Sequence, residues 1–302
     1  MKTMLLSILL FCNVAFAQTT DLTSKPVQVI IPFAPGGGMD IVFRHIQAVA
    51  ASKNINMVAV YKPGADGMIG INALLSATPD GFTIGMTPAS TIATYELANP
   101  GSVVPILTGL VSGIGVYVVR AESNINTFRD LREVLHNGAP LNVGYGAPGQ
   151  KLMLEQLLEF VKPDHRPVMV PFKGGQPVLM ALLGGHIDFA WLPYNVAQAS
   201  AASGRIKILA ISGTKIAEYP DVPFMPDRYK GWKEVDAGGV SVSPNIPNHI
   251  LVEWKLFFKT YLEDPKTKEY FLTQSSSPVM PFGSEPLEKL VKNSKEKLQK
   301  MQ

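Results

Sequence analysis

The sequence predicts an α/β protein with two lobes, each built on a sheet rich in parallel strands, and a hinged cleft between the lobes. Three short apolar runs, at 27–31, 57–61 and 82–86, each lead into a loop of small residues and then into a segment with helical periodicity. Repeated units of this kind form parallel sheets covered by helices. The pattern restarts near residue 120 and continues to about residue 233, which predicts a second sheet.

The first residues have the three parts of a secretory signal peptide. Lys2 supplies a positive charge, residues 4–14 are apolar, and Ala15-Phe16-Ala17 is a small-x-small cleavage site. We therefore expect residues 1–17 to be removed, so that the mature chain begins at Gln18 in an exported compartment. The alternative is an uncleaved membrane anchor, which we disfavour because the apolar run is short for a bilayer.

The composition favours a globular protein and disfavours several kinds of chemistry. The 302 residues are 46% hydrophobic and 17% charged, which is enough for one or two domains with cores. The formal charge of +3 is mild and no basic run is interleaved with aromatics, so we expect no nucleic-acid partner. The five histidines lack metal-ligand spacing, and we expect no metal and no cofactor. Cys12 is the only cysteine and lies in the signal peptide, so we expect no disulfide.

The chain is organised around the apolar strand at 27–31, the glycine loop that follows, and the helix that opens near Asp40. Such a loop leaves backbone N–H groups free at the positive end of a helix dipole, which is an anion site that needs no basic side chain. Asp40 lies where capping residues lie, so we favour a structural role over a catalytic one. The alternative is a tight turn with glycines for geometry alone, since no known phosphate-binding pattern is present.

Two further loops follow the next two strands, at 62–70 (K-P-G-A-D-G-M-I-G) and at 87–90 (T-P-A-S). Ligands of parallel sheets lie at the carboxyl ends of the strands. Three anion-friendly loops at one edge therefore favour a binding site over turn geometry.

The second unit repeats the pattern. Thr127 and Asp130 form a capping box at the start of a helix. Polar or glycine loops follow two of its strands, at 145–150 and 172–175. The expected strands are 115–120, 141–144, 168–171, 186–192 and 206–212, and the expected helices end near 135, 161, 183 and 203.

The tail is expected to return to the first lobe. After residue 219 the chain is rich in proline and glycine, and it then has one apolar segment followed by helices near 248–261, 266–273 and 286–299. We therefore assign residues 18–119 and 234–302 to the first lobe and residues 120–233 to the second, with two crossings between them.

Few residues suggest catalysis. No Gly-x-Ser-x-Gly motif is present, so a serine hydrolase is disfavoured. Phe33, Tyr145 and Trp191 fall at strand ends, where they either line a cleft or pack the lobes. Asp188 lies in an apolar strand, and either a ligand contact or an internal hydrogen bond would explain it.

Taken in order, the loops resemble those of the tripartite tricarboxylate transporter solute receptors, the TctC or Bug family. The similar segments are residues 32–40, 62–70, 79–83, 170–175, 183–188, 204–207 and 220–223. The resemblance covers about residues 25–225, and the tail matches poorly. It implies a periplasmic, two-lobed binding protein of the type II, flytrap kind. Such a protein is a non-catalytic, usually monomeric receptor that delivers a small carboxylate to a permease with one large and one small membrane subunit.

The resemblance also implies how the ligand is held. In that family, backbone N–H groups and ordered waters at the first two loops hold the carboxylate. The residues we expect at the ligand, with Trp191 added from its strand-end position, are Phe33, Ala34, Pro35, Gly36, Gly37, Asp40, Gly64, Ala65, Asp66, Gly67, Thr87, Ser90, Tyr145, Ala147, Gly149, Lys173, Gly174, Gly175 and Trp191.

The chain departs from the family pattern at two loops. Where the family offers serines and a histidine in the second lobe, this chain has Ala147, Gln150, Met153 and Leu154. In the second loop Asp66 replaces a glycine. A carboxylate there either points to solvent or pairs with a cationic group on the ligand, as in an amino acid.

Two other functions stay open from the sequence. One is a secreted α/β enzyme that acts on a carboxylated substrate, which would need a nucleophile or a matched acid–base pair. The other is a sensor subunit that presents a bound carboxylate to a membrane kinase.

Overall fold

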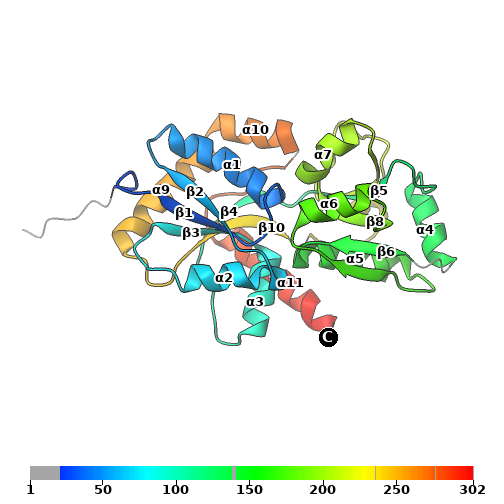
Figure 1. Cartoon of the computed structure of the whole chain (residues 1–302), viewed down its shortest axis with the longest axis horizontal. Helices are drawn as coiled ribbons and strands as arrows, with labels where there is room; N and C mark the ends of the chain where they lie inside the picture. Colours follow the sequence, from blue (N-terminus) through cyan, green and yellow to red (C-terminus); the bar gives the residue numbers. More distant parts are fainter. Residues whose placement is uncertain (1–20, 138–140, 235, 276, 302) are drawn as a thin grey trace, which may run out of the picture.

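The computed structural model describes residues 21–137, 141–234, 236–275 and 277–301, and it shows two lobes side by side (Figure 1). The predicted signal peptide at 1–17 lies outside the described residues. Within these ranges, none of the helices combines the length and the apolar character that a membrane span requires.

The first lobe is built on a mixed five-stranded sheet in the order β2-β1-β3-β10-β4. β1 lies between β2 and β3 and is parallel to both, whereas β10 runs antiparallel to its neighbours β3 and β4. The strands are β1 (Val27–Ile31), β2 (Met57–Tyr61), β3 (Thr83–Pro88), β4 (Ile106–Ser112) and β10 (Ala237–Val242).

The second lobe repeats this arrangement in the order β7-β6-β8-β5-β9. β6 is parallel to β7 and β8, and β5 is antiparallel to β8 and β9. The strands are β5 (Gly115–Arg120), β6 (Asn142–Tyr145), β7 (Val168–Pro171), β8 (Phe189–Pro193) and β9 (Ile206–Ser212). The predicted two-lobed α/β fold with a parallel-rich sheet in each lobe is confirmed.

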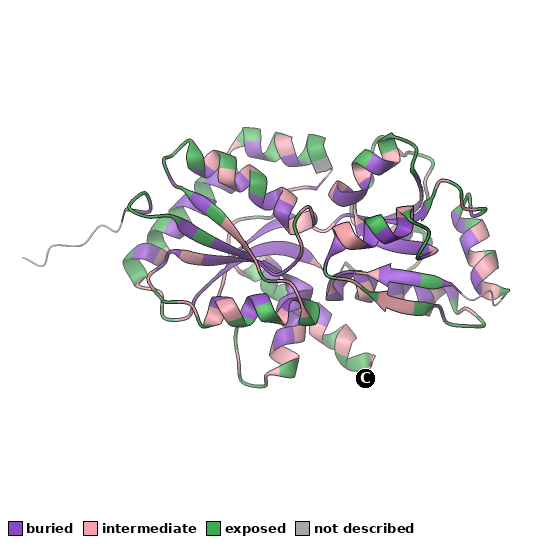
Figure 2. Ribbon diagram, viewed as in Figure 1, coloured by how far each residue is buried: buried purple, intermediate pink, exposed green. Residues whose placement is uncertain are grey.

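Helices cover both sheets, with their inner faces buried and their outer faces exposed (Figure 2). In the first lobe Trp254, Phe258 and Tyr261 on one helix are almost fully buried against the sheet. The helices are α1 (Gly38–Ala51), α2 (Met68–Leu75), α3 (Ala89–Ala98), α4 (Phe128–His136), α5 (Pro148–Val161), α6 (Gly175–Leu183), α7 (Tyr194–Ala202), α8 (Met225–Arg228), α9 (Asn248–Glu263), α10 (Pro265–Ser275) and α11 (Glu285–Lys300), with a 3₁₀ turn η1 (Ala65–Gly67) before α2.

Two local predictions have clear outcomes. The capping box at the start of α4 is confirmed, because the Thr127 side chain accepts from the Asp130 N–H and the Asp130 carboxylate accepts from the Thr127 N–H. The prediction of a separate loop at 87–90 is wrong, because β3 ends at Pro88 and α3 begins at Ala89. Pro88 itself provides the turn from strand to helix.

The chain crosses between the lobes near Gly113, because β4 belongs to the first sheet and β5 to the second. It returns before β10. The last helix joins both lobes: Leu287 and Val291 pack in the first lobe, whereas Met301, just beyond the helix, packs against the core of the second. The lobe boundaries stay a prediction, and we propose from the sheets that the first one lies near Gly113 and not at residue 119.

Candidate ligand-binding site

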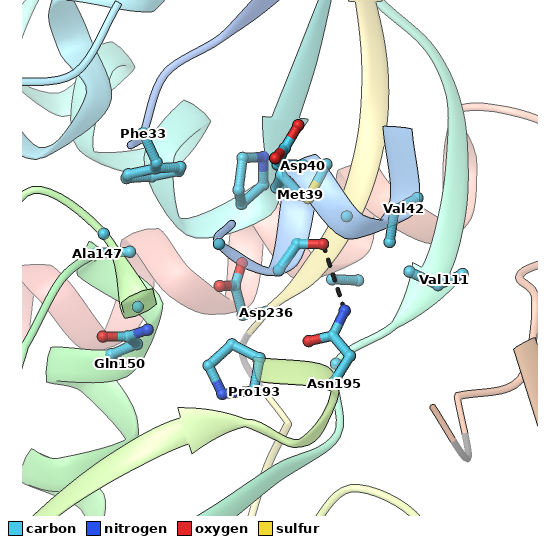
Figure 3. Close-up of a pocket in the computed structure, with 18 of the residues that line it drawn as sticks. Phe33, Met39, Asp40, Val42, Val111, Ala147, Gln150, Pro193, Asn195 and Asp236 are labelled. Carbon is cyan, nitrogen blue, oxygen red and sulfur yellow. Dashed lines mark hydrogen bonds between the residues drawn. The ribbon is translucent and has the colours of Figure 1, made fainter. Parts of the chain in front are cut away.

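A cavity of about 100 Å³ lies between the lobes, where the carboxyl ends of the parallel strands face each other (Figure 3). Its walls include Phe33, Met39 and Val111 from the first lobe and Trp191 and Pro193 from the second. This volume is somewhat smaller than that of a cavity of about 150 Å³ that binds benzene. The cavity therefore suits one small molecule or the reactive end of a larger one.

Five helix N-termini meet at this cavity. In each case the lining includes the residue that precedes the helix or its first residue. None of the five N-cap side chains accepts a capping hydrogen bond, so these helix ends present partial positive charge. Two of them have an acidic side chain nearby: Asp40 lies in the first turn of α1, and the Asp236 carboxylate accepts the Ser90 N–H of α3. The helices and their cavity-lining residues are α1 with Gly37 and Gly38, α3 with Pro88, α5 with Ala147, α6 with Gly174 and Gly175, and α7 with Pro193.

Asp40 holds the loop before α1 in shape. Its buried carboxylate accepts hydrogen bonds from the Gly36 N–H at 2.8 Å and the Tyr61 hydroxyl at 2.8 Å. It also pairs with Arg44 Nε at 3.2 Å. Burial and then the hydrogen bond to Asp40 raise the pKa of Tyr61 above its usual value. Both Asp40 oxygens are thus committed to the protein, which agrees with the structural role favoured from the sequence.

The loops of the two lobes touch directly. The Ala34 N–H donates to the Lys173 carbonyl at 2.9 Å, and the Asn195 side-chain amide donates to the Gly38 carbonyl at 3.3 Å. Gly174 sits at this contact with φ +128°, and a Cβ there would lie 3.3 Å from the Ala34 nitrogen. Glycine is therefore required both for the backbone conformation and for the close approach.

Asp236 lies just before β10 and contributes a carboxylate to the cavity (Figure 3). Its Oδ1 accepts the Ser90 N–H of α3 at 3.1 Å. Burial raises the pKa of Asp236 to about 6, although the Ser90 N–H opposes that rise. A Cβ on Gly149 of α5 would lie 1.9 Å from Asp236 Oδ2, so α5 also approaches the carboxylate closely.

A second cavity of about 340 Å³ lies next to the first, and Phe33 lines both. We call the first the inner cavity and the second the outer chamber. Asp66 is exposed here and has a left-handed φ of +54°. Tyr145 and Lys173 line the same cavity. Burial, with a smaller contribution from the Asp66 charge, raises the pKa of Tyr145. Asp66 therefore lies in an outer chamber and not among the five helix ends.

The structure divides the sequence-predicted residues into three groups. Phe33, Ala34, Gly37, Asp40, Ala147, Gly174, Gly175 and Trp191 line the inner cavity. Phe33, Gly64, Ala65, Asp66, Gly67, Tyr145 and Lys173 line the outer one. Pro35, Gly36, Thr87, Ser90 and Gly149 line neither of these two cavities.

Two of the residues in the last group have evident local roles. Thr87 Oγ1 lies 2.6 Å from Ser241 Oγ inside the first sheet, and Ser90 contacts Asp236 through its backbone. Asp188, which the sequence left open, accepts the Asn142 N–H at 2.7 Å, which is the internal hydrogen bond of the two alternatives.

Sequence reasoning missed Asp236 and Asn195. Asp236 falls in the stretch of proline and glycine after residue 219, where no motif marks it. Asn195 is the second residue of α7, and only its position at a strand end, directly after β8, could have suggested a contact.

Comparisons with known proteins find relatives of this chain in both sequence and structure. A sequence model described as "Tripartite tricarboxylate transporter family receptor" matches residues 42–301. A relative from Cupriavidus necator, "UPF0065 protein in gbd 5'region", is 29% identical over 247 residues, which are 76% of this chain and 70% of the relative.

Solved structures share the fold. The periplasmic binding protein BugD superposes with a TM-score of 0.83 at 23% identity, over 92% of this chain and 97% of BugD. MatC from Rhodopseudomonas palustris, solved with bound malate, superposes with a TM-score of 0.78 at 21% identity, over 90% of this chain and 98% of MatC.

Proposed function

Because this chain belongs to the tripartite tricarboxylate transporter receptor family, we propose that it captures a small carboxylate between its lobes and hands it to a membrane permease. The observation that carries this proposal is the convergence on one cavity of five helix N-termini, none of which is capped by its own N-cap side chain. Each N-terminus has the effect of about half a positive charge. A carboxylate would find both charge and N–H donors there.

The donors we propose are backbone groups of the glycine loops. Among the described residues that line the inner cavity, none is lysine, arginine or histidine. An anion at this position would therefore be held by N–H groups at the starts of α1, α5, α6 and α7. The malate that MatC holds supports the ligand class for a protein of the same fold.

Lobe closure is the mechanism we propose for signalling that the site is filled. The bonds from Ala34 to Lys173 and from Asn195 to Gly38 form only when the two lobes meet. A ligand that bridges both lobes shifts an open–closed equilibrium towards the closed form. We propose that the large and small permease subunits recognise this closed form of a monomeric, periplasmic receptor.

A binding role fits the inner cavity better than catalysis does. Among its described lining residues the titratable side chains are Asp40 and Asp236. Both oxygens of Asp40 are occupied by three protein partners. Asp236 then has no second group with which to form an acid–base pair.

Calorimetric titration of the mature chain with malate, succinate, propionate and a set of amino acids tests the proposal. Gly174→Ala should lower the affinity for any ligand that binds by at least about tenfold, since it strains the loop at the lobe contact. Gly204→Ala is the matched control, because Gly204 also has positive φ but has nothing near its Cβ position. Equal affinity of both variants and the parent would contradict the role of this loop. No binding across the panel would contradict the receptor function.

A further inference from the structure

The inner cavity contains acidic side chains as well as helix N-termini. The charged side chains among its described lining residues are Asp40 and Asp236, and both are acidic. Asp40 is balanced by Arg44 and two further donors. None of the ion pairs found among the described residues includes Asp236. Among the described residues Asp236 therefore has no cationic side chain as a partner, and its Oδ1 accepts the Ser90 N–H at the start of α3.

A second acceptor lies on the opposite lobe. Asn195 uses its side-chain NH₂ group on the Gly38 carbonyl, and this fixes which atom of the amide is the oxygen. That oxygen, Oδ1, is buried and has no hydrogen-bond partner. A buried acceptor without a donor is costly unless a ligand supplies the donor.

These two acceptors call for a group that is both cationic and rich in N–H donors. Asp236 is half-buried, and the walls around its carboxylate are largely apolar, so water screens a partner of this charge only in part. Asp236 Oδ1 already accepts the Ser90 N–H, which leaves Oδ2 to receive a further donor. An ammonium group has three donors and a full positive charge.

Resting on the proposed function, we propose that the ligand is an amino acid whose ammonium group binds Asp236 and Asn195 while its carboxylate lies at the helix N-termini. One end of such a zwitterion suits the carboxylate of Asp236, and the other suits the uncapped helix ends. The cavity of about 100 Å³ restricts the part of the ligand held there to a few non-hydrogen atoms. From the sequence, Asp66 is one candidate partner for a cationic group on the ligand. We assign that role to Asp236 in the inner cavity instead of Asp66 in the outer chamber.

Matched ligand pairs test this assignment. Alanine is compared with propionate, aspartate with succinate, and glutamate with glutarate, so that each pair differs in the amino group alone. In calorimetric titrations at pH 7.5 we expect the parent protein to prefer the amino acid in at least one pair by about 30-fold or more. Asp236→Asn keeps the shape and the acceptor for Ser90, and it should remove most of that preference.

The control is Asp164→Asn, which removes the same charge from an exposed loop of the second lobe. It should leave the preference unchanged. If Asp236→Asn does not fold, Asn195→Ala serves as the second variant, because it removes the other acceptor and should also reduce the preference.

Each outcome has a definite meaning. If neither member of any pair binds, both the receptor function and this inference fail. If the simple acids bind as well as the amino acids or better, the receptor function stands and the inference is overturned. If Asp236→Asn lowers the affinity for both members of a pair equally, Asp236 positions the lobes and does not bind the ammonium group. This outcome also overturns the inference.

Discussion

Replacing Asp40 with alanine should destabilise the protein even though Asp40 lies at the cavity. The change removes the acceptor for the Gly36 N–H and the Tyr61 hydroxyl, both at 2.8 Å, and for Arg44 Nε at 3.2 Å. Hydrogen bonds to a charged acceptor contribute about 1.5–3 kcal/mol each when buried. Gly36 and Tyr61 are partly exposed, so we place each at the lower end of that range.

The Arg44 pair adds little. Its side chain is 55% exposed, and pairs of that kind contribute about 0–1 kcal/mol. We therefore expect Asp40→Ala to lower the free energy of unfolding by about 3 kcal/mol. Arg44→Ala should lower it by less than about 1 kcal/mol.

Urea unfolding followed by far-UV circular dichroism measures both values. A double-mutant cycle with Tyr61→Phe should give a coupling energy of about 1–2 kcal/mol, since that change removes the hydroxyl and keeps the ring. The reasoning is refuted if Asp40→Ala costs no more than Arg44→Ala, or if the cycle shows no coupling. Asp40 would then be free for the ligand.

Four further predictions follow from the cavity and the segment before β10. Burial raises the pKa of Glu234 to about 7, so the stability that its protonated form contributes is complete below its usual pKa and is lost as pH rises through 7. Glu234→Gln should therefore raise the free energy of unfolding by about 3 kcal/mol at pH 8 and by almost nothing at pH 4, as thermal unfolding will show. Gly149→Ala places a Cβ 1.9 Å from Asp236 Oδ2, and calorimetry should show ligand binding weakened by more than about tenfold. With the pKa of Asp236 raised to about 6, affinity for an amino acid should fall as pH decreases through 6, whereas an unchanged affinity from pH 7.5 to 5 would count against Asp236 as the ammonium partner. Trp191 lines the cavity, so a ligand should change the tryptophan fluorescence of the parent but not of Trp191→Phe, in which Trp232 and Trp254 remain.

The sequence was sufficient for the fold because its signals are local. β1, with Val27, Val29 and Ile31 fully buried, appears as a continuous apolar run, and the glycine loop after it marks where a helix begins. The place of β10 between β3 and β4 could not be predicted in the same way. That insertion depends on pairing with strands more than a hundred residues away, and the local pattern contains no information about it.

The candidate site divides along the same line. The loop residues of the first lobe could be predicted because glycine and proline have specific backbone roles. Asp236 and Asn195 could not be predicted, since each reaches the cavity only through the tertiary arrangement of the two lobes. The exposure of Asp66 likewise depends on the 3₁₀ turn in which it lies, with φ at +54°.

The central claim is that helix N-termini between the lobes, at the starts of α1, α5, α6 and α7, receive the carboxylate of a small molecule. Thermal unfolding of the mature chain against a panel of small carboxylates and amino acids tests it most directly. A ligand at 100 times its dissociation constant stabilises the folded state by about 2.7 kcal/mol, which raises the melting temperature by a few degrees. We predict such a rise for at least one compound with a carboxylate and for none of the corresponding amides. A rise of equal size with the amides, or no rise across the panel, would contradict the account.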